Sequence, residues 1–408
     1  HSVMIQEKRG MFKRWNMILV ILTYALVIFG TFLTRSGVLS SVHAFAQSTI
    51  GPLFFIFIGI TFAISLKLLF RGWESLYSEN MLSSWLSREG LFLLNNLLFM
   101  GILLACFWGV IYPLISELAT GQKVTVGPPF YERTTGPQFA ALLFLMGVAP
   151  LAAWRVTTVR RLGNIIWKPT VFSLLAPLCV LLAGVTNPAA LLSLWLTALV
   201  LSVTLYEFFR GATARRKSTG DNILRALWDL IAHNRRRYGG YVIHLGVTLM
   251  AVGIIGIEMF QTETQGTLAH GEQIKLGDYT MIYNNLVEFP TDDNRIVTRA
   301  MVSVYKHGQF VAKLHPRRDF YVDNQQPMTI PGLYSTIESD FYVLLVGWKP
   351  IGVQSATFKI YLNPLVNWLW FGGFVFIFGT LIAAWPVKHE LHARQPIDPQ
   401  HSTSSRVV

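Results

Sequence analysis

The most regular feature of the sequence is a series of long apolar runs separated by polar segments. A helix needs about 20 apolar residues to cross about 30 Å of hydrocarbon. Eight runs reach or approach that length, although the fourth and fifth are short. The pattern predicts a polytopic α-helical membrane protein with spans near residues 15–34, 52–70, 91–115, 139–155, 171–187, 189–209, 241–260 and 365–386.

The stretch 261–364, between the last two spans, has a different pattern. Short β-branched and aromatic runs alternate with turn signals at Gly277-Asp278 and His307-Gly308. We expect a small β domain, which at about 100 residues is large enough to fold alone. Two of its histidines, His270 and His307, stand beside glycines and are interpreted as solvated turn residues. The expected strands are 273–276, 279–283, 296–305, 309–314, 342–346 and 356–361.

The predicted organisation therefore has four parts. Residues 1–260 form a seven-span bundle, 261–364 the β domain, 365–386 the last span, and 387–408 a polar tail. The opening residues resemble the end of a membrane helix entering water, which predicts that the chain is a fragment or a split-gene product.

Charge separates the two sides of the predicted membrane. Charged residues make up 14% of the chain and hydrophobic residues 52%; a soluble domain has about 25% charged residues. This composition excludes a single soluble globular domain. The net charge of +12 arises largely from Lys and Arg in alternate connections, which the positive-inside rule places in the cytoplasm. Nucleic-acid binding is not needed to explain the charge, and the β domain is expected on the outer side.

Residues 221–232, in one of these basic loops, have helical periodicity. Asp221 is a candidate cap, and the predicted apolar face consists of Ile223, Leu224, Leu227, Trp228 and Ile231. A basic amphipathic helix of this kind is typical of a membrane surface. Lipid contact is the simpler interpretation, and docking of a partner is the alternative.

Two histidines, His1 and His244, are predicted to lie inside the membrane. An ionisable residue inside a span is costly and therefore a functional candidate. His244 follows Arg237 by about 10 Å of helix, and His1 precedes Glu7 by about 9 Å. Both charged edges are predicted on the cytoplasmic side, so the two imidazoles can lie at equal depth and ligate one haem iron. The alternative is a lone histidine in an interhelical hydrogen bond.

Other polar residues at span ends are also candidates. His43 lies in the amphipathic outer loop after Arg35, where a neutral imidazole can ligate a metal or transfer protons. Arg35 either pairs with a carboxylate such as a haem propionate or extends to the interface. Glu89 and Asn95, near the start of the third span, are interpreted as interhelical hydrogen-bonding groups, with Ser87 as a possible cap.

Several stretches together resemble the CcmF family of cytochrome c maturation proteins. They are Gly30 to Ala46 around Arg35 and His43, Leu86 to Asn96, His244-Leu-Gly, Asn363 to Gly373, and the opening His1-Ser. The resemblance covers the chain from end to end. It implies a membrane haem b held by His1 and His244, and a role for His43 as a ligand of the haem being delivered. The family's Trp-Trp-x-Trp-Asp loop and second outer ligand would precede His1.

The resemblance also implies a function, that of a haem lyase subunit in the bacterial inner membrane with 261–364 in the periplasm. Haem, the transferred substrate, would pass from the chaperone CcmE to the Cys-x-x-Cys-His motif of apocytochrome c, with CcmH/CcmI-type proteins as partners. Two alternatives stay open: a transmembrane haem transporter, and a non-catalytic scaffold that recruits apocytochrome c. The spans show no internal repeat of the kind many transporters have.

Overall fold

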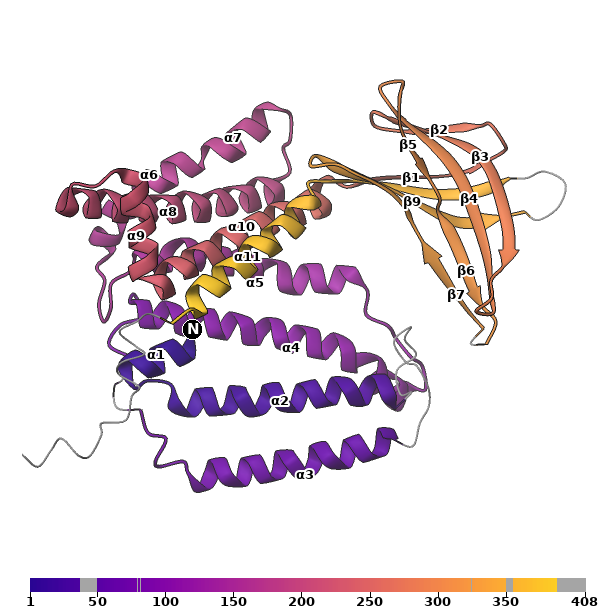
Figure 1. Cartoon of the computed structure of the whole chain (residues 1–408). Coiled ribbons are helices and arrows are strands. Elements are labelled where there is room, and N and C mark those ends of the chain that lie inside the picture. The colour runs from indigo at the N-terminus through magenta and orange to yellow at the C-terminus, as the bar shows by residue number, and fades with distance from the viewer. Residues whose placement is uncertain (37–49, 79, 81, 324, 350–354, 387–408) are drawn as a thin grey trace, which may run out of the picture. The chain divides into compact units, whose positions relative to one another are not determined.

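The computed structural model describes residues 1–408 except 37–49, 79, 81, 324, 350–354 and 387–408, and it is mainly helical with one β region (Figure 1). The predicted tail 387–408 lies outside the described residues. The chain divides into two compact units, 1–170 and 171–408, which are described separately. Eight helices of the described part are long and apolar enough to cross a membrane, which confirms the number of predicted spans.

The first unit contains the first four spans. Ser87 begins the third of them as predicted, because its Oγ accepts a hydrogen bond from Gly90 N at 3.0 Å. That helix ends at Gly121, which adopts φ 69°. The helices of this unit are α1 (Ser2–Arg9), α2 (Lys13–Arg35), α3 (Ile50–Arg71), α4 (Arg88–Thr120), α5 (Pro128–Val148) with the short 3-10 helix Ala149–Leu151, and α6 (Val159–Ser173), which runs into the second unit.

Two spans begin earlier than the apolar runs indicate. The fourth covers Pro128–Leu151 instead of 139–155, and the fifth covers Val159–Leu182 instead of 171–187. Pro128 occupies the first turn of α5, where a missing N–H costs little. The helix then continues through Pro137, which membrane helices tolerate. The polar first turns of both helices concealed their true starts.

The helices of the second unit are α7 (Leu175–Leu182), α8 (Pro188–Thr219), α9 (Ile223–His233), α10 (Arg235–Phe260) and α11 (Asn367–Ala384). The predicted amphipathic helix is α9, although its cap is Asn222 and not Asp221: the Asn222 side chain accepts from Leu224 N at 3.3 Å. The predicted apolar face divides in two. Leu224 and Trp228 are exposed, whereas the other three residues pack against a cluster formed by Ala212, Leu230, Tyr238 and Tyr241.

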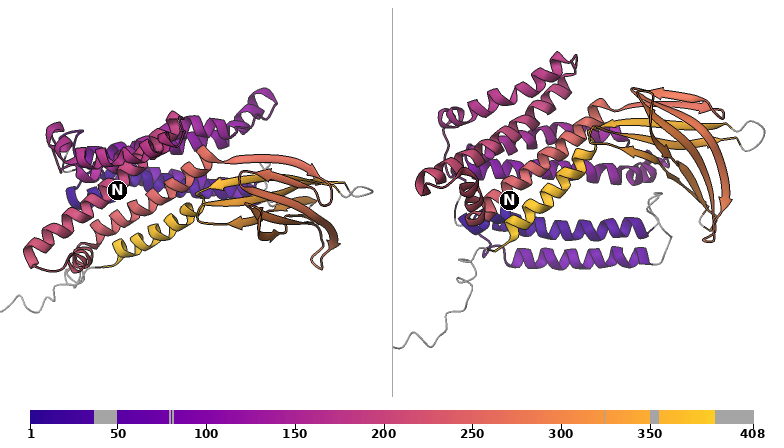
Figure 2. Two further views of the ribbon diagram at one scale, coloured as in Figure 1. Left: turned by 90° about the horizontal axis from the view of Figure 1, so that it is seen from above. Right: turned by 45° about the horizontal axis from the view of Figure 1, so that its top comes forward.

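Helices α10 and α11 form the closest helix pair of this unit, and Figure 2 shows them running side by side into the β region. Glycines line both sides of the contact. A Cβ atom added at any of them would lie 2.5–2.7 Å from a backbone atom of the other helix. Small residues allow membrane helices to approach this closely. The glycines are Gly239, Gly246 and Gly253 on α10, and Gly372 and Gly379 on α11.

The predicted β domain lies between α10 and α11 in the sequence. It has two antiparallel sheets, one with the strand order β1-β10-β9-β8 and the other with the order β2-β3-β4-β6-β7. Strand β5 pairs with β4. Alternate residues such as Tyr283, Val302, Phe341 and Phe358 are buried between the sheets. The strands are β1 (Thr262–Leu268), β2 (Gln273–Leu276), β3 (Tyr279–Pro290), β4 (Arg295–Lys306), β5 (Gln309–Leu314), β6 (Arg317–Tyr321), β7 (Gln326–Ile330), β8 (Gly332–Ser335), β9 (Ser339–Trp348) and β10 (Ala356–Pro364).

All six predicted strands are present, and both predicted turns connect hairpins. His307 and Gly308 adopt φ 51° and 80°, the left-handed conformation that a two-residue hairpin turn requires. His270 and His307 are exposed, as expected of turn residues. Strands β1, β6, β7 and β8 were not predicted.

Polar contacts join the β domain to both of its helices. Asn367, the first residue of α11, donates through Nδ2 to Ser335 Oγ at 2.8 Å, Thr336 O at 2.6 Å and Asp340 Oδ1 at 2.9 Å. At the end of α10, Gln261 Nε2 lies 2.6 Å from Asn363 Oδ1. The domain is therefore held at two points, one on each helix.

Candidate functional site

His244 lies within α10, two residues before Gly246. Its Nδ1 atom is buried, and its ring makes no hydrogen bond to the part of the chain that the structure describes. The ring of Tyr241 stands beside it, with centroids 6.5 Å apart. The interhelical hydrogen bond that was the alternative interpretation of this residue is thus not seen among the described residues. A buried imidazole without a partner is suited to ligate a metal ion.

His1 lies in the first unit, just before α1. Its Nδ1 atom is 3.2 Å from Asn95 Nδ2 of α4, and its ring stacks on Phe92 with centroids 5.0 Å apart. Asn95 therefore makes a polar contact from α4 to the residue that precedes α1. These contacts hold the imidazole through one nitrogen and one face. Because His1 and His244 belong to different units, their ligation of a common iron stays a prediction.

The two candidates that the sequence predicts on the outer side have different outcomes. His43 lies outside the described residues. Arg35 is the last residue of α2 and its side chain is exposed. Exposure at a span end is compatible with both interpretations of this arginine, so its pairing with a propionate stays a prediction.

A buried carboxylate in α8, missed by the sequence reasoning, adjoins the His244 helix. The side chain of Glu207 is 1% exposed, and its oxygens lie 2.9 Å from Nη2 of both Arg210 and Arg237. Tyr241 donates to the same carboxylate at 3.1 Å. The spacing of Glu207 and Arg210 was a weak signal, since residues three apart face each other on a helix. The contact with Arg237, thirty residues away, had no local signal.

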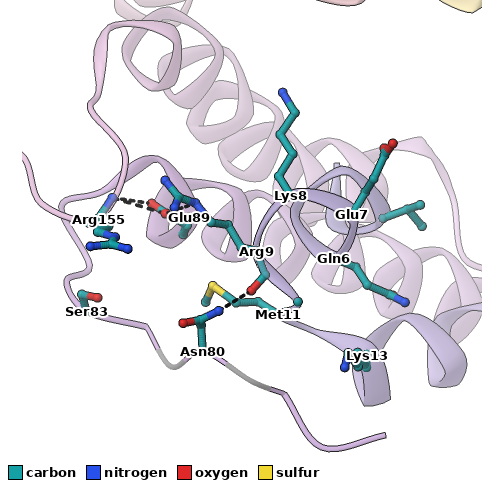
Figure 3. Close-up of a pocket in the computed structure, with 12 residues that line it drawn as sticks. Gln6, Glu7, Lys8, Arg9, Met11, Lys13, Asn80, Ser83, Glu89 and Arg155 are labelled. Atoms are coloured by element: carbon teal, nitrogen blue, oxygen red, sulfur yellow. Dashed lines mark hydrogen bonds and ion pairs between the residues drawn. The ribbon is translucent and has the colours of Figure 1, made fainter. Parts of the chain in front are cut away.

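A polar cavity of about 820 Å³ opens in the first unit, around α1 (Figure 3). Its wall includes Lys8, Arg9 and Arg155, and the carboxylate of Glu89 stands among them. Glu89 is 4% exposed; its oxygens accept from Arg155 N at 3.0 and 3.2 Å and lie 3.6 Å from Arg9 Nε. Glu89 thus joins α4 to the segment after α5 and neutralises part of a basic wall.

An apolar groove of about 490 Å³ lies between α2 and α4 of the same unit. Its only amide is that of Asn96, whose buried Nδ2 lacks a hydrogen-bond partner among the described residues. Neither His1 nor His244 is part of its lining. The groove is therefore not assigned as the site of the haem predicted from the sequence.

Comparison with known proteins gives consistent results for sequence and structure. Residues 259–364 match the family model described as the CcmF C-terminal beta-sandwich. Over 399 residues the chain is 31% identical to the cytochrome c-type biogenesis protein CcmF of Pseudomonas fluorescens, which covers 97% of this chain and 58% of that protein. It is 26% identical to CcmF of Escherichia coli, over 100% of this chain and 60% of that protein.

The solved structure named "Cytochrome c Heme Lyase CcmF" has a similar fold, with a TM-score of 0.73 and 27% sequence identity. The match covers 95% of this chain and 57% of the solved one. The chain therefore spans less than two thirds of the length of the proteins it matches. The similarity includes the helices as well as the β domain.

Proposed function

Because this chain is similar in sequence and fold to the C-terminal part of CcmF proteins, we propose that it is a haem-binding portion of a cytochrome c haem lyase. The proposal rests on a similarity that extends over 97% of the chain and so includes the helix that bears His244. The substrates are haem and the Cys-x-x-Cys-His motif of apocytochrome c. The thiols of that motif are the nucleophiles, and the protein accelerates their addition by holding the reactants close and oriented.

We assign His244 and His1 as axial ligands of a haem b in the membrane. His244 fits this role because its buried Nδ1 has no competing partner among the described residues. His1 fits because Phe92 stacks on its ring and the side-chain amide of Asn95 lies 3.2 Å from its Nδ1. With that amide turned so that its oxygen accepts from Nδ1–H, Nε2 is the nitrogen that would ligate the iron. The bound haem b would supply electrons that keep the delivered haem reduced.

On the outer side, His43 is assigned as a ligand of the delivered haem and Arg35 as a partner of one of its propionates. The proposed location is the bacterial inner membrane, with 261–364 in the periplasm. The haem chaperone CcmE and CcmH/CcmI-type proteins are the proposed partners. Protease added to sealed spheroplasts should cut within 261–364 and spare the basic loop 210–240; the reverse pattern would exclude this orientation.

The ligand assignments are tested by spectra of purified full-length variants. His244→Ala should abolish the low-spin bis-histidine spectrum, whereas His43→Ala should retain it and abolish cytochrome c maturation. His270→Ala is the matched control, since this exposed turn histidine should affect neither readout. A His244→Ala protein with an unchanged haem spectrum would refute the assignment, and so would loss of haem b in His43→Ala.

A further inference from the structure

Three side chains of the His244 helix lie on one face and lead toward its basic end. Arg237, Tyr241 and His244 are spaced four and three residues apart, which places them above one another on a helix. Two helical turns, about 10 Å, separate Arg237 from His244. The ring contact between Tyr241 and His244 and the hydrogen bond from Arg237 Nε to Tyr241 Oη, at 3.3 Å, show that the row is continuous.

The basic end of this row carries more positive than negative charge. Two guanidinium groups, those of Arg210 and Arg237, share the single carboxylate of Glu207. The carboxylate is 1% exposed, but the arginine side chains are 46% and 50% exposed. Glu207 therefore neutralises one of the two positive charges. The second remains at the surface where α8 and α10 meet.

The hydrogen bonds of the two arginines, like their charges, leave capacity for a further anion. Arg210 contacts Glu207 through Nη2 alone, and Arg237 uses Nε and Nη2. The Nη1 atom of each arginine has no partner within the described residues. Each guanidinium is thus held in place on one side and can donate to another anion on the other.

Other acidic groups of the second unit's basic loop are engaged elsewhere. Asp229 lies 3.5 Å from Arg215 Nη2, and Asp221 lies 3.9 Å from Arg225 Nε. Neither ion pair involves the Glu207 cluster. Within the described residues, Glu207 is therefore the acidic group that contacts Arg210 and Arg237, and one positive charge is left for another anion.

We propose that Arg210 and Arg237 bind the propionate carboxylates of the haem whose iron His244 ligates, an inference that rests on the proposed function. A haem extends its two carboxylates from one edge of the ring, away from the iron. Two helical turns along one face is a separation of the size that such a ligand requires. Arginine binds carboxylates through paired, charge-assisted hydrogen bonds, and Tyr241 would lie beside the macrocycle between the two ends.

An anionic lipid phosphate offers the same oxygen chemistry, so the experiment must distinguish the two sources. The full-length protein is loaded with haem or with haem dimethyl ester, in which the carboxylates are blocked, in neutral detergent with and without anionic lipid. The readouts are the rate of haem loss to apomyoglobin and the midpoint potential. Arg210→Gln and Arg237→Gln are compared with wild type and with Arg225→Gln, a control at an exposed arginine outside the cluster.

With haem, each glutamine variant should lose the ligand about tenfold faster, the scale of one charge-assisted hydrogen bond. The midpoint potential should fall while the low-spin spectrum persists, because a positive charge that disfavours ferric iron is gone. With the dimethyl ester, wild type and variants should behave alike. A difference that persists with the ester, or that appears only with anionic lipid, would overturn the proposal in favour of a phosphate.

Glu207→Gln resolves the case in which an arginine variant folds poorly. It removes the shared carboxylate and keeps both guanidinium groups, so haem should be held at least as tightly and the midpoint potential should rise. If it loses haem as fast as Arg237→Gln, the cluster acts only as a structural support and the proposal fails. If wild type itself binds no low-spin haem, the proposed function fails and this inference with it. Normal haem binding by wild type with unaffected arginine variants would refute this inference alone.

Discussion

Neighbouring glycines in α11 allow the packing of the helix pair to be tested with a matched control. A Cβ atom at Gly372 would lie 2.6 Å from Gly246 O and Met250 N, both backbone atoms of α10. A Cβ atom at Gly373 would meet nothing within 4 Å. Gly372→Ala should therefore push the helices apart, and Gly373→Ala should not.

The magnitude follows from the difference between the two variants. An ordinary Cβ contact lies at 3.4–4 Å, so the Gly372→Ala helices must separate by most of an ångström. Overpacking of this kind costs about 1–3 kcal/mol. Both variants gain about 0.5–1 kcal/mol of helix propensity, which cancels when they are compared. Gly372→Ala should thus be less stable than Gly373→Ala by about 1–3 kcal/mol.

The assay is reversible unfolding of the purified protein in mixed micelles, followed by circular dichroism as the denaturing detergent increases. The adjacent pair Gly239 and Gly240 repeats the comparison on α10, because only Gly239 faces Ala383 of α11, with a Cβ distance of 2.7 Å. Equal stability of the two variants in both pairs would show that the close approach of the helices is not required for stability.

Two further changes test contacts described above. Asn367→Asp replaces the amide donor by a second carboxylate beside Asp340 and should lower the melting temperature at neutral pH, because the hydrogen bond is lost and two like charges face each other; an unchanged melting temperature would refute the contact. Glu89→Ala removes a buried carboxylate together with its hydrogen bonds from Arg155 N and its ion pair with Arg9, and it should cost about 1–3 kcal/mol in unfolding experiments. Glu117→Ala, at a carboxylate 54% exposed, should cost less than about 1 kcal/mol, and equal losses would exclude a special role for Glu89.

The sequence predicted most accurately those features that depend on local pattern. Apolar length identified all eight spans, and alternation with turn residues identified β2 and β5 to the residue. The errors also have local causes. At Asp221 and Asn222, two adjacent residues are both good caps, and only the backbone conformation selects Asn222.

Features that depend on distant partners were not predictable in the same way. Strand β1 contains Thr, Glu, Gln and Gly, and it is ordered by pairing with β10, where Thr262 lies opposite Leu362. The buried carboxylate of Glu207 is stabilised by Arg237 and Tyr241, which lie on another helix. No period or motif in one segment records such a contact, because its energy belongs to the pair.

The joints at Asn367 and Gln261, together with the glycine contact, have a mechanical consequence. A helix pair that touches backbone to backbone has little freedom to slide, and the end of α10 and the start of α11 are both hydrogen-bonded to one β-sandwich. A force applied to that sandwich is therefore expected to move α10 as a rigid unit. His244 lies about 25 Å along that helix from Gln261. A load on the β domain is therefore expected to reach the segment of α10 that carries His244.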